Sequence, residues 1–155
     1  MRTRTLLSGL VLAFLTIACA AAAPNFTGSW KLNTSKSDFG QMPPPNSMTQ
    51  TVTHEEPKIK IAMKQSSDMG DFEYEREYTT DGKEYTNDMR GNPVKSVLKW
   101  DGDVLVITTK GKFGDNEFTA VDRWTLAADG KTVTINRHWT SDMGEMDNKL
   151  VLEKQ

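Results

Sequence analysis

The sequence predicts an all-β fold, an antiparallel up-and-down β-barrel of about ten strands. Three observations predict it: apolar and polar residues alternate over many short segments, Asp-Gly pairs separate several of these segments, and no segment shows a helical period of useful length. Alternation with period two gives a strand one buried face and one solvated face. Asp-Gly pairs adopt the positive φ angles that tight hairpin turns need. A chain of 155 residues suggests one such domain.

The N-terminal segment is expected to be a secretory signal peptide comprising residues 1–22. Arg2 and Arg4 give it a positive start, and an apolar run follows from Leu6 to Ile17. The small residues Ala20–Ala23 then form a cleavage region of the A-x-A kind. The sequence therefore predicts export, with this segment excluded from the fold.

Residues 23–155 are expected to form a single barrel domain, monomeric, and either periplasmic or secreted. Cys19 is the only cysteine and lies in the segment to be removed, so the mature chain would have no disulfide. Secreted animal proteins more often carry disulfides, which favours an exported bacterial protein. Two alternatives stay open: an uncleaved signal anchor, and a lipid anchor through Cys19. After cleavage, no integral membrane segment is expected.

The charge balance argues against one class of partner. Lys and Arg total 19 and Asp and Glu total 21, which gives a formal net charge of −2. A nucleic-acid-binding domain would show a basic patch, so nucleic acid is not expected as a partner.

The clearest alternation lies in three segments. In Lys58–Lys64, three apolar residues share one face. In Phe72–Thr79, three glutamates share one face and the aromatic residues share the other with Arg76. In Lys131–Trp139, Arg137 shares the face of Val and Ile. The full set of strands is expected near residues 26–33, 47–54, 58–66, 72–79, 83–87, 94–100, 103–109, 117–127, 131–140 and 148–154.

The connections predict how the strands are arranged. Tight turns are expected at Glu55–Pro57, Asp81-Gly82, Asp101-Gly102 and Asp129-Gly130, and longer loops at Ser67–Asp71, Asp88–Pro93, Gly111–Asn116 and Ser141–Asn148. The two kinds alternate along the chain. In a meander, alternate turns fall at opposite ends, so one end is expected to carry the longer loops. A meander of this many short strands closes into a barrel because closure removes exposed sheet edges.

Phe26–Leu32 reads F-T-G-S-W-K-L and resembles the first strand of the lipocalins, and more fully that of the fatty-acid-binding proteins, within the calycin superfamily. Val94–Val106 is similar to a central hairpin of the latter family. The resemblance implies a barrel that encloses an apolar ligand, with Gly28 and Trp30 as structural, barrel-closing residues. Arg123 matches a family position and is included among the candidate ligand-binding residues.

This sequence departs from the family in two places. The family has a helix-turn-helix lid after its first strand, whereas Thr34–Asn46 is short and contains three consecutive prolines. The family also ends with an R-x-Y pair that grips a ligand carboxylate, and Leu150-Val151-Leu152 stands there instead. The sequence therefore predicts a lidless barrel without the usual carboxylate clamp.

Arg76 and Arg137 are the main candidates for ligand binding, because both lie on otherwise apolar strand faces. A buried guanidinium needs partners, and Tyr74 and Tyr78 share the face of Arg76. The functional interpretation is that these groups hold an anionic head. The structural interpretation is that one of the two arginines packs over Trp30.

Three further residues complete the candidate site. Met63 and Trp139 are expected to line the cavity, since pockets are mainly apolar. Arg123 alternates with Trp124, which places it outside the barrel unless a bulge intervenes.

The loops carry many Asp, Glu and Met residues, but no calcium-loop motif, so no metal and no cofactor is expected. The sequence also shows no catalytic motif, so the protein is not expected to be an enzyme. We expect an exported lipocalin-like protein that binds a small hydrophobic or amphipathic ligand. The alternative is a filled barrel that acts as a cell-envelope interaction module.

Overall fold

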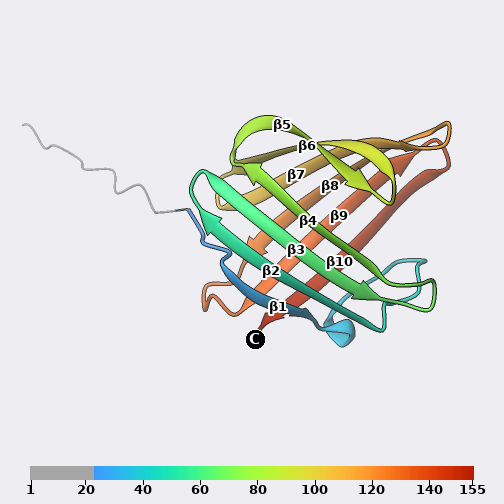
Figure 1. Cartoon of the computed structure of the whole chain (residues 1–155). Coiled ribbons are helices and arrows are strands. Elements are labelled where there is room, and N and C mark those ends of the chain that lie inside the picture. Colours follow the sequence, from blue (N-terminus) through green and yellow to red (C-terminus); the bar gives the residue numbers. More distant parts are fainter. Residues whose placement is uncertain (1–22) are drawn as a thin grey trace, which may run out of the picture.

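The computed structural model describes residues 23–155, and the predicted signal peptide lies outside the described residues. These residues form ten antiparallel strands wound into a barrel (Figure 1). The strands are β1 (Gly28–Leu32), β2 (Ser47–Glu55), β3 (Lys58–Ser66), β4 (Phe72–Thr79), β5 (Asp81–Met89), β6 (Asn92–Asp101), β7 (Val104–Phe113), β8 (Asn116–Leu126), β9 (Thr132–Ser141) and β10 (Gly144–Lys154). The predicted number and order of strands are confirmed. No helix among the described residues has the length and apolarity to cross a bilayer.

The strands form one sheet in the order β4-β3-β2-β1-β10-β9-β8-β7-β6-β5. Pairing of β1 with β10, Trp30 opposite Lys154, brings the first and last strands together and nearly closes the barrel. Within residues 23–155, no hydrogen-bonded ladder joins β4 to β5, although a single residue, Thr80, connects them. The barrel therefore has a gap between these two strands, and side chains rather than backbone groups bridge it.

The predicted alternation holds along the strands that line the interior. In β2, every second residue from Met48 to His54 is buried and the residues between them are exposed. In β4, Arg76 and Tyr78 are buried while the three glutamates are exposed. This pattern follows from the pleat, which points successive side chains to opposite faces.

The prediction of longer loops at one end is wrong for three of the four. The strands continue through these segments to two-residue turns, Arg90-Gly91, Gly114-Asp115 and Asp142-Met143. Arg90 and Gly91 both have positive φ, 53° and 82°, as a tight hairpin turn of this kind requires. The polar residues that suggested loops lie instead on solvated strand faces. Conversely, Asp129-Gly130 lies in a five-residue connection, and Asp81-Gly82 belongs to β5.

The segment between β1 and β2 lies across one end of the barrel. It contains one short 3₁₀ helix, η1 (Thr34–Lys36), and the predicted absence of a two-helix lid is confirmed. Backbone bonds between Asp38 and Lys149, both 2.7 Å, fix it to β10. We call this end, which also carries the turns β3–β4, β5–β6, β7–β8 and β9–β10, the open end.

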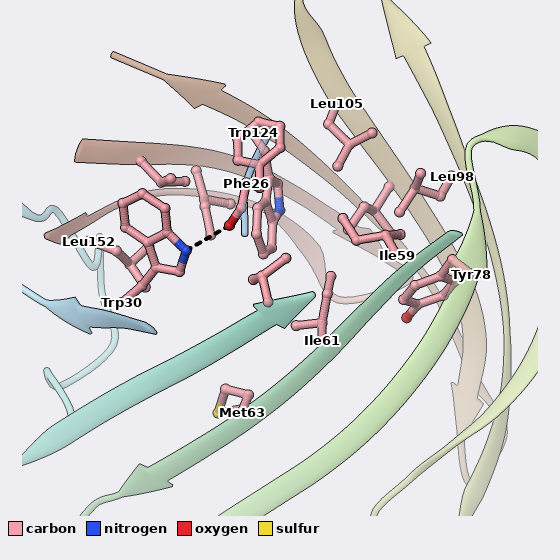
Figure 2. Close-up of a cluster of buried hydrophobic side chains, with 14 of the residues drawn as sticks. Phe26, Trp30, Ile59, Ile61, Met63, Tyr78, Leu98, Leu105, Trp124 and Leu152 are labelled. Atoms are coloured by element: carbon pink, nitrogen blue, oxygen red, sulfur yellow. Dashed lines mark hydrogen bonds between the residues drawn. The ribbon is translucent and has the colours of Figure 1, made fainter. Parts of the chain in front are cut away.

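The opposite end is filled by a packed core, shown in Figure 2. Phe26 is fully buried, and its ring meets the Trp124 ring edge-on at 5.9 Å between centroids. The Trp30 indole N–H donates to the Phe26 carbonyl at 2.9 Å, so the polar atom of this buried ring is satisfied. Gly28 has φ 154°, and a Cβ there would meet the Lys154 side chain at 2.9 Å. We call this end the closed end.

Glu56 holds three elements together at the closed end. Its carboxylate accepts hydrogen bonds from the Trp100 indole at 2.8 Å, from the Thr80 hydroxyl and from the His54 ring at 3.0 Å. Burial alone would raise the pKa of Glu56, but these hydrogen bonds outweigh it and hold the pKa below its ordinary value. The carboxylate therefore stabilises the fold in its ionised form.

Glu56→Gln is expected to lower the free energy of unfolding by about 1 kcal/mol at neutral pH, because the group is partly exposed and keeps weaker neutral hydrogen bonds. The folded pKa is depressed, so the stabilisation is present above the unfolded pKa and lost as pH falls through the folded one. Urea unfolding of both proteins from pH 7 to pH 3 checks this. The difference between them should shrink towards acid, and a constant difference would contradict the assignment.

Candidate functional site

A cavity of about 660 Å³ occupies the open half of the barrel. This volume is within the range of small-molecule binding sites. Residues from the β1–β2 segment and from all ten strands contribute to its wall. The barrel is therefore filled at the closed end and hollow at the open end.

Most of the cavity wall is apolar and rich in Met and aromatic side chains. The aromatic and methionine residues that line it are Phe39, Phe72, Tyr74, Tyr78, Phe113, Trp124, Trp139, Met42, Met48, Met63, Met69, Met89 and Met146. The Phe118 ring lies behind the wall, stacked on Trp139 at 4.2 Å. Leu150 also faces the cavity, at the place where the resembled family carries a carboxylate clamp.

One wall carries a partly buried ion pair between neighbouring strands. Arg137 of β9 and Asp122 of β8 are paired in register, and two hydrogen bonds of 2.6 Å join Nε and Nη2 of Arg137 to the two carboxylate oxygens. The charge of Asp122 raises the pKa of Arg137. The Arg137 side chain is 38% exposed, and the residue lines the cavity. Its charge is thus already neutralised without a ligand.

Arg76 on the opposite wall has no such carboxylate partner among the described residues. Only 7% of it is exposed. Its Nη2 donates to the Asp88 carbonyl at 3.2 Å, which bridges the gap between β4 and β5. Its guanidinium carbon also lies 4.1 Å from the centre of the Tyr74 ring. The Nε–H of Arg76 has no hydrogen-bond partner within residues 23–155. A buried cation without a counter-charge attracts anions, so Arg76 is a candidate for binding one.

Two tyrosine hydroxyls accompany this cation. Burial raises the pKa of Tyr74 to about 12, and the charges of Arg76 and Arg137 lower it only in part. Burial likewise raises the pKa of Tyr78. Both phenols are therefore neutral at ordinary pH and able to donate a hydrogen bond to an anion.

Two more buried polar atoms on the cavity wall lack partners. They are Oε1 of Gln50 on β2 and Nε1 of Trp124 on β8. Both residues are at least 95% buried. Buried polar atoms are normally hydrogen-bonded, so these two are polar groups beside the cavity whose hydrogen-bonding capacity is unused within the described residues.

Six of the seven candidate ligand-binding residues line this one cavity: Tyr74, Tyr78, Arg76, Arg137, Met63 and Trp139. The seventh, Arg123, does not. Its side chain is on the outer face and forms an ion pair of 2.7 Å with Asp101. No bulge shifts β8 there, since the register with β7 runs unbroken through this residue. The inclusion of Arg123 in the cavity was therefore wrong.

The suggestion that Arg76 or Arg137 packs over Trp30 was also wrong. The cation over the Trp30 ring is Lys154, with Nζ 5.4 Å from the ring centre. Pairing of β1 with β10 sets these two residues opposite each other.

Sequence reasoning missed two polar residues of the site. Asp122 lies two residues from both Ala120 and Trp124, so alternation alone assigns it to the inner face. Gln50 lies between Met48 and Val52 on the inner face of β2 in the same way. Both residues could have been found by treating every polar residue on an apolar strand face as a candidate, and not only the arginines.

No group of three or more His, Cys, Asp or Glu side chains within residues 23–155 is placed to hold a metal ion.

No family model matches this sequence, and no curated protein is similar to it in sequence. Solved structures match in fold. A secretory abundant heat soluble protein from Ramazzottius varieornatus is 11% identical over 83% of this chain and 94% of that one, with a TM-score of 0.58. The zebrafish ileal bile acid-binding protein, solved with cholic acid, is 12% identical over 84% and 98%, with a TM-score of 0.55. A Schistosoma mansoni fatty acid-binding protein, solved with arachidonic acid, is 16% identical over 84% and 96%, with a TM-score of 0.52.

These similarities and the strand order show that the chain has the same fold as these proteins, an antiparallel ten-stranded barrel. The fold that the resemblance implied is confirmed.

Proposed function

We propose that this chain is an exported binding protein, not an enzyme, which holds one small amphipathic ligand in the cavity of its open end. The observation that carries the proposal is Arg76, a buried cation without a carboxylate partner, in an otherwise largely apolar cavity. Two of the structurally similar proteins were solved with cholic acid and arachidonic acid, which are amphipathic acids. That likeness supports this class of ligand.

Charge favours a ligand with one anionic group. Arg137 and Asp122 neutralise each other, and the other charged lining residues, Asp68 and Arg90, are exposed, so the one buried charge without a carboxylate partner among the described residues is that of Arg76. The Arg76 guanidinium and the Tyr74 and Tyr78 hydroxyls provide donors for that group. The Met and aromatic wall then covers an apolar body. Export through residues 1–22 would place this activity in the periplasm or outside the cell.

The hollow open end favours this function over the filled-barrel interaction module. A solid barrel would leave no room for a ligand, whereas about 660 Å³ is available here.

The first test is native mass spectrometry of the protein purified without detergent, followed by titration with matched long-chain acids, alcohols and amines. A retained amphipathic molecule, or saturable binding that favours the acid, supports the proposal. A clean unliganded mass together with no binding of any of the three overturns it.

A cavity-filling variant links the binding to the cavity. Ala120 lies on the inner face of β8, lines the cavity and is buried. Ala120→Phe is expected to weaken binding at least about tenfold by occupying ligand space, a change of about 1.4 kcal/mol. The control is Thr119→Phe, one residue earlier on the outer face, which should bind as the wild type does. Equal effects of both variants would place the ligand outside the barrel.

A further inference from the structure

Methionine is concentrated around the cavity to an unusual degree. Six methionines line it: Met42, Met48, Met63, Met69, Met89 and Met146. Thioether side chains are apolar and flexible, and suit a wall that adapts to a ligand. The same sulfur atoms are the oxidisable groups of this cavity, since Cys19 lies in the predicted signal peptide.

These methionines differ strongly in exposure. Met48 and Met63 are only 5% and 6% exposed, deep in the wall. Met42 and Met69 also line the cavity but are 48% and 73% exposed, at its mouth. Met143 is 83% exposed and does not line the cavity. An oxidant in solution therefore reaches Met42 and Met69 without unfolding the barrel.

Met42 and Met69 lie on two segments that are tied together. Met42 belongs to the segment between β1 and β2, and Met69 to the β3–β4 turn. The Asn46 side chain donates to the Asp68 carboxylate at 2.9 Å, and the Asn46 backbone N–H donates to the Ser66 carbonyl at 2.9 Å. Both methionines thus line the cavity from two segments that are hydrogen-bonded to each other.

We propose that Met42 and Met69 form an oxidant-sensitive modification site at the mouth, and that their oxidation to sulfoxides by peroxides lowers the affinity for an apolar or amphipathic ligand. The inference rests on the proposed binding function. The thioether sulfur attacks one peroxide oxygen, an S–O bond forms and the O–O bond breaks. Sulfur loses two electrons, and the other oxygen takes them and leaves as water with both protons.

The sulfoxide changes the wall from apolar to polar. A ligand that covers the mouth would have to remove water from this strong hydrogen-bond acceptor without replacing its hydrogen bonds. The expected loss of affinity is about tenfold per sulfoxide covered, corresponding to the cost of desolvating one unpaired polar group. Methionine sulfoxide reductases would reverse the change.

The test is graded treatment of the folded protein with hydrogen peroxide. Peptide mass spectrometry should show Met143, Met69 and Met42 oxidised before Met48 and Met63. Affinity for the neutral apolar dye Nile red should fall about tenfold or more in the oxidised protein. Treatment with sulfoxide reductases of both stereospecificities should restore it.

Two variants decide which methionines matter. Met143→Leu should stay as sensitive to peroxide as the wild type, because this residue does not line the cavity. Met42→Leu with Met69→Leu alters the cavity wall, so it is compared with itself: its affinity after treatment should equal its own affinity before treatment. If the wild-type affinity survives complete oxidation of Met42 and Met69, the inference is overturned while the proposed function stands. If the untreated protein binds neither Nile red nor any amphiphile, both are overturned.

Discussion

Asp122→Ala is expected to lower the free energy of unfolding by about 3 kcal/mol, because it leaves the Arg137 guanidinium unpaired inside the barrel. The two side chains share two hydrogen bonds of 2.6 Å, and only 15% of the Asp122 side chain is exposed. The Arg137 side chain is 38% exposed, so the expected loss is at the low end of what breaking a buried ion pair costs. Urea unfolding at neutral pH measures it.

Asp101→Ala is the matched control. It breaks the ion pair of Asp101 with Arg123, which also joins an aspartate to an arginine but lies on the outer face. The expected loss there is at most about 1 kcal/mol, since exposed ion pairs contribute little. A second control, Asp122→Ala with Arg137→Met, removes both charges and should recover part of the stability. Equal losses in Asp122→Ala and Asp101→Ala would show that the cavity pair is as well solvated as the surface pair.

The fold could be predicted from sequence because the alternation of apolar and polar residues with period two is a local property of the chain. This alternation shows directly which face of each strand is buried. Phe72–Thr79 shows why: its glutamates and aromatics occupy opposite faces in the sequence and in the structure. Strand order follows from short connections, which make neighbours in sequence neighbours in the sheet. The closure of β1 on β10 is the long-range contact that the barrel prediction required, and it is present.

The ends of the strands could not be placed from composition. Segments such as Asp88–Pro93 are polar because the outer face is solvated, and polar residues favour both an exposed strand and a loop. The position of the positive-φ residues decides between them, and here they fall at Arg90-Gly91. The tight turn predicted at Asp81-Gly82 was also wrong, because the turn lies at Thr80 and β5 already includes this pair.

Six of the seven candidate residues were correctly predicted to line the cavity, but the charge balance between them was not predicted. Alternation correctly assigned Arg76 and Arg137 to inner faces, but it cannot say which of two inner cations is neutralised. That depends on the register of β8 with β9, which sets Asp122 opposite Arg137. It also depends on the gap beside β4, which leaves Arg76 bonded to a backbone carbonyl. Register and gap are properties of the assembled barrel.

Arg76→Met is expected to weaken binding of a long-chain carboxylic acid about 100-fold, while binding of the alcohol with the same chain changes little. A charged hydrogen-bonded contact inside a cavity contributes about 1.5–3 kcal/mol, and the upper part of this range corresponds to about 100-fold in affinity. Methionine preserves most of the packing against the Tyr74 ring and removes the charge. Isothermal titration of both ligands against both proteins gives the coupling between head group and side chain.

Arg76→Lys separates charge from geometry. Lysine keeps the positive charge but lacks the planar fork that carries both the bond to the Asp88 carbonyl and the unused Nε–H, so acid binding should recover only in part. Arg123→Met, on the outer face, should bind acid and alcohol as the wild type does. If Arg76→Met weakens both ligands equally, Arg76 holds the wall in shape across the β4–β5 gap and does not recognise the head group. If it weakens neither, the anionic head lies elsewhere in the cavity, and the Arg137–Asp122 pair is the next group to vary.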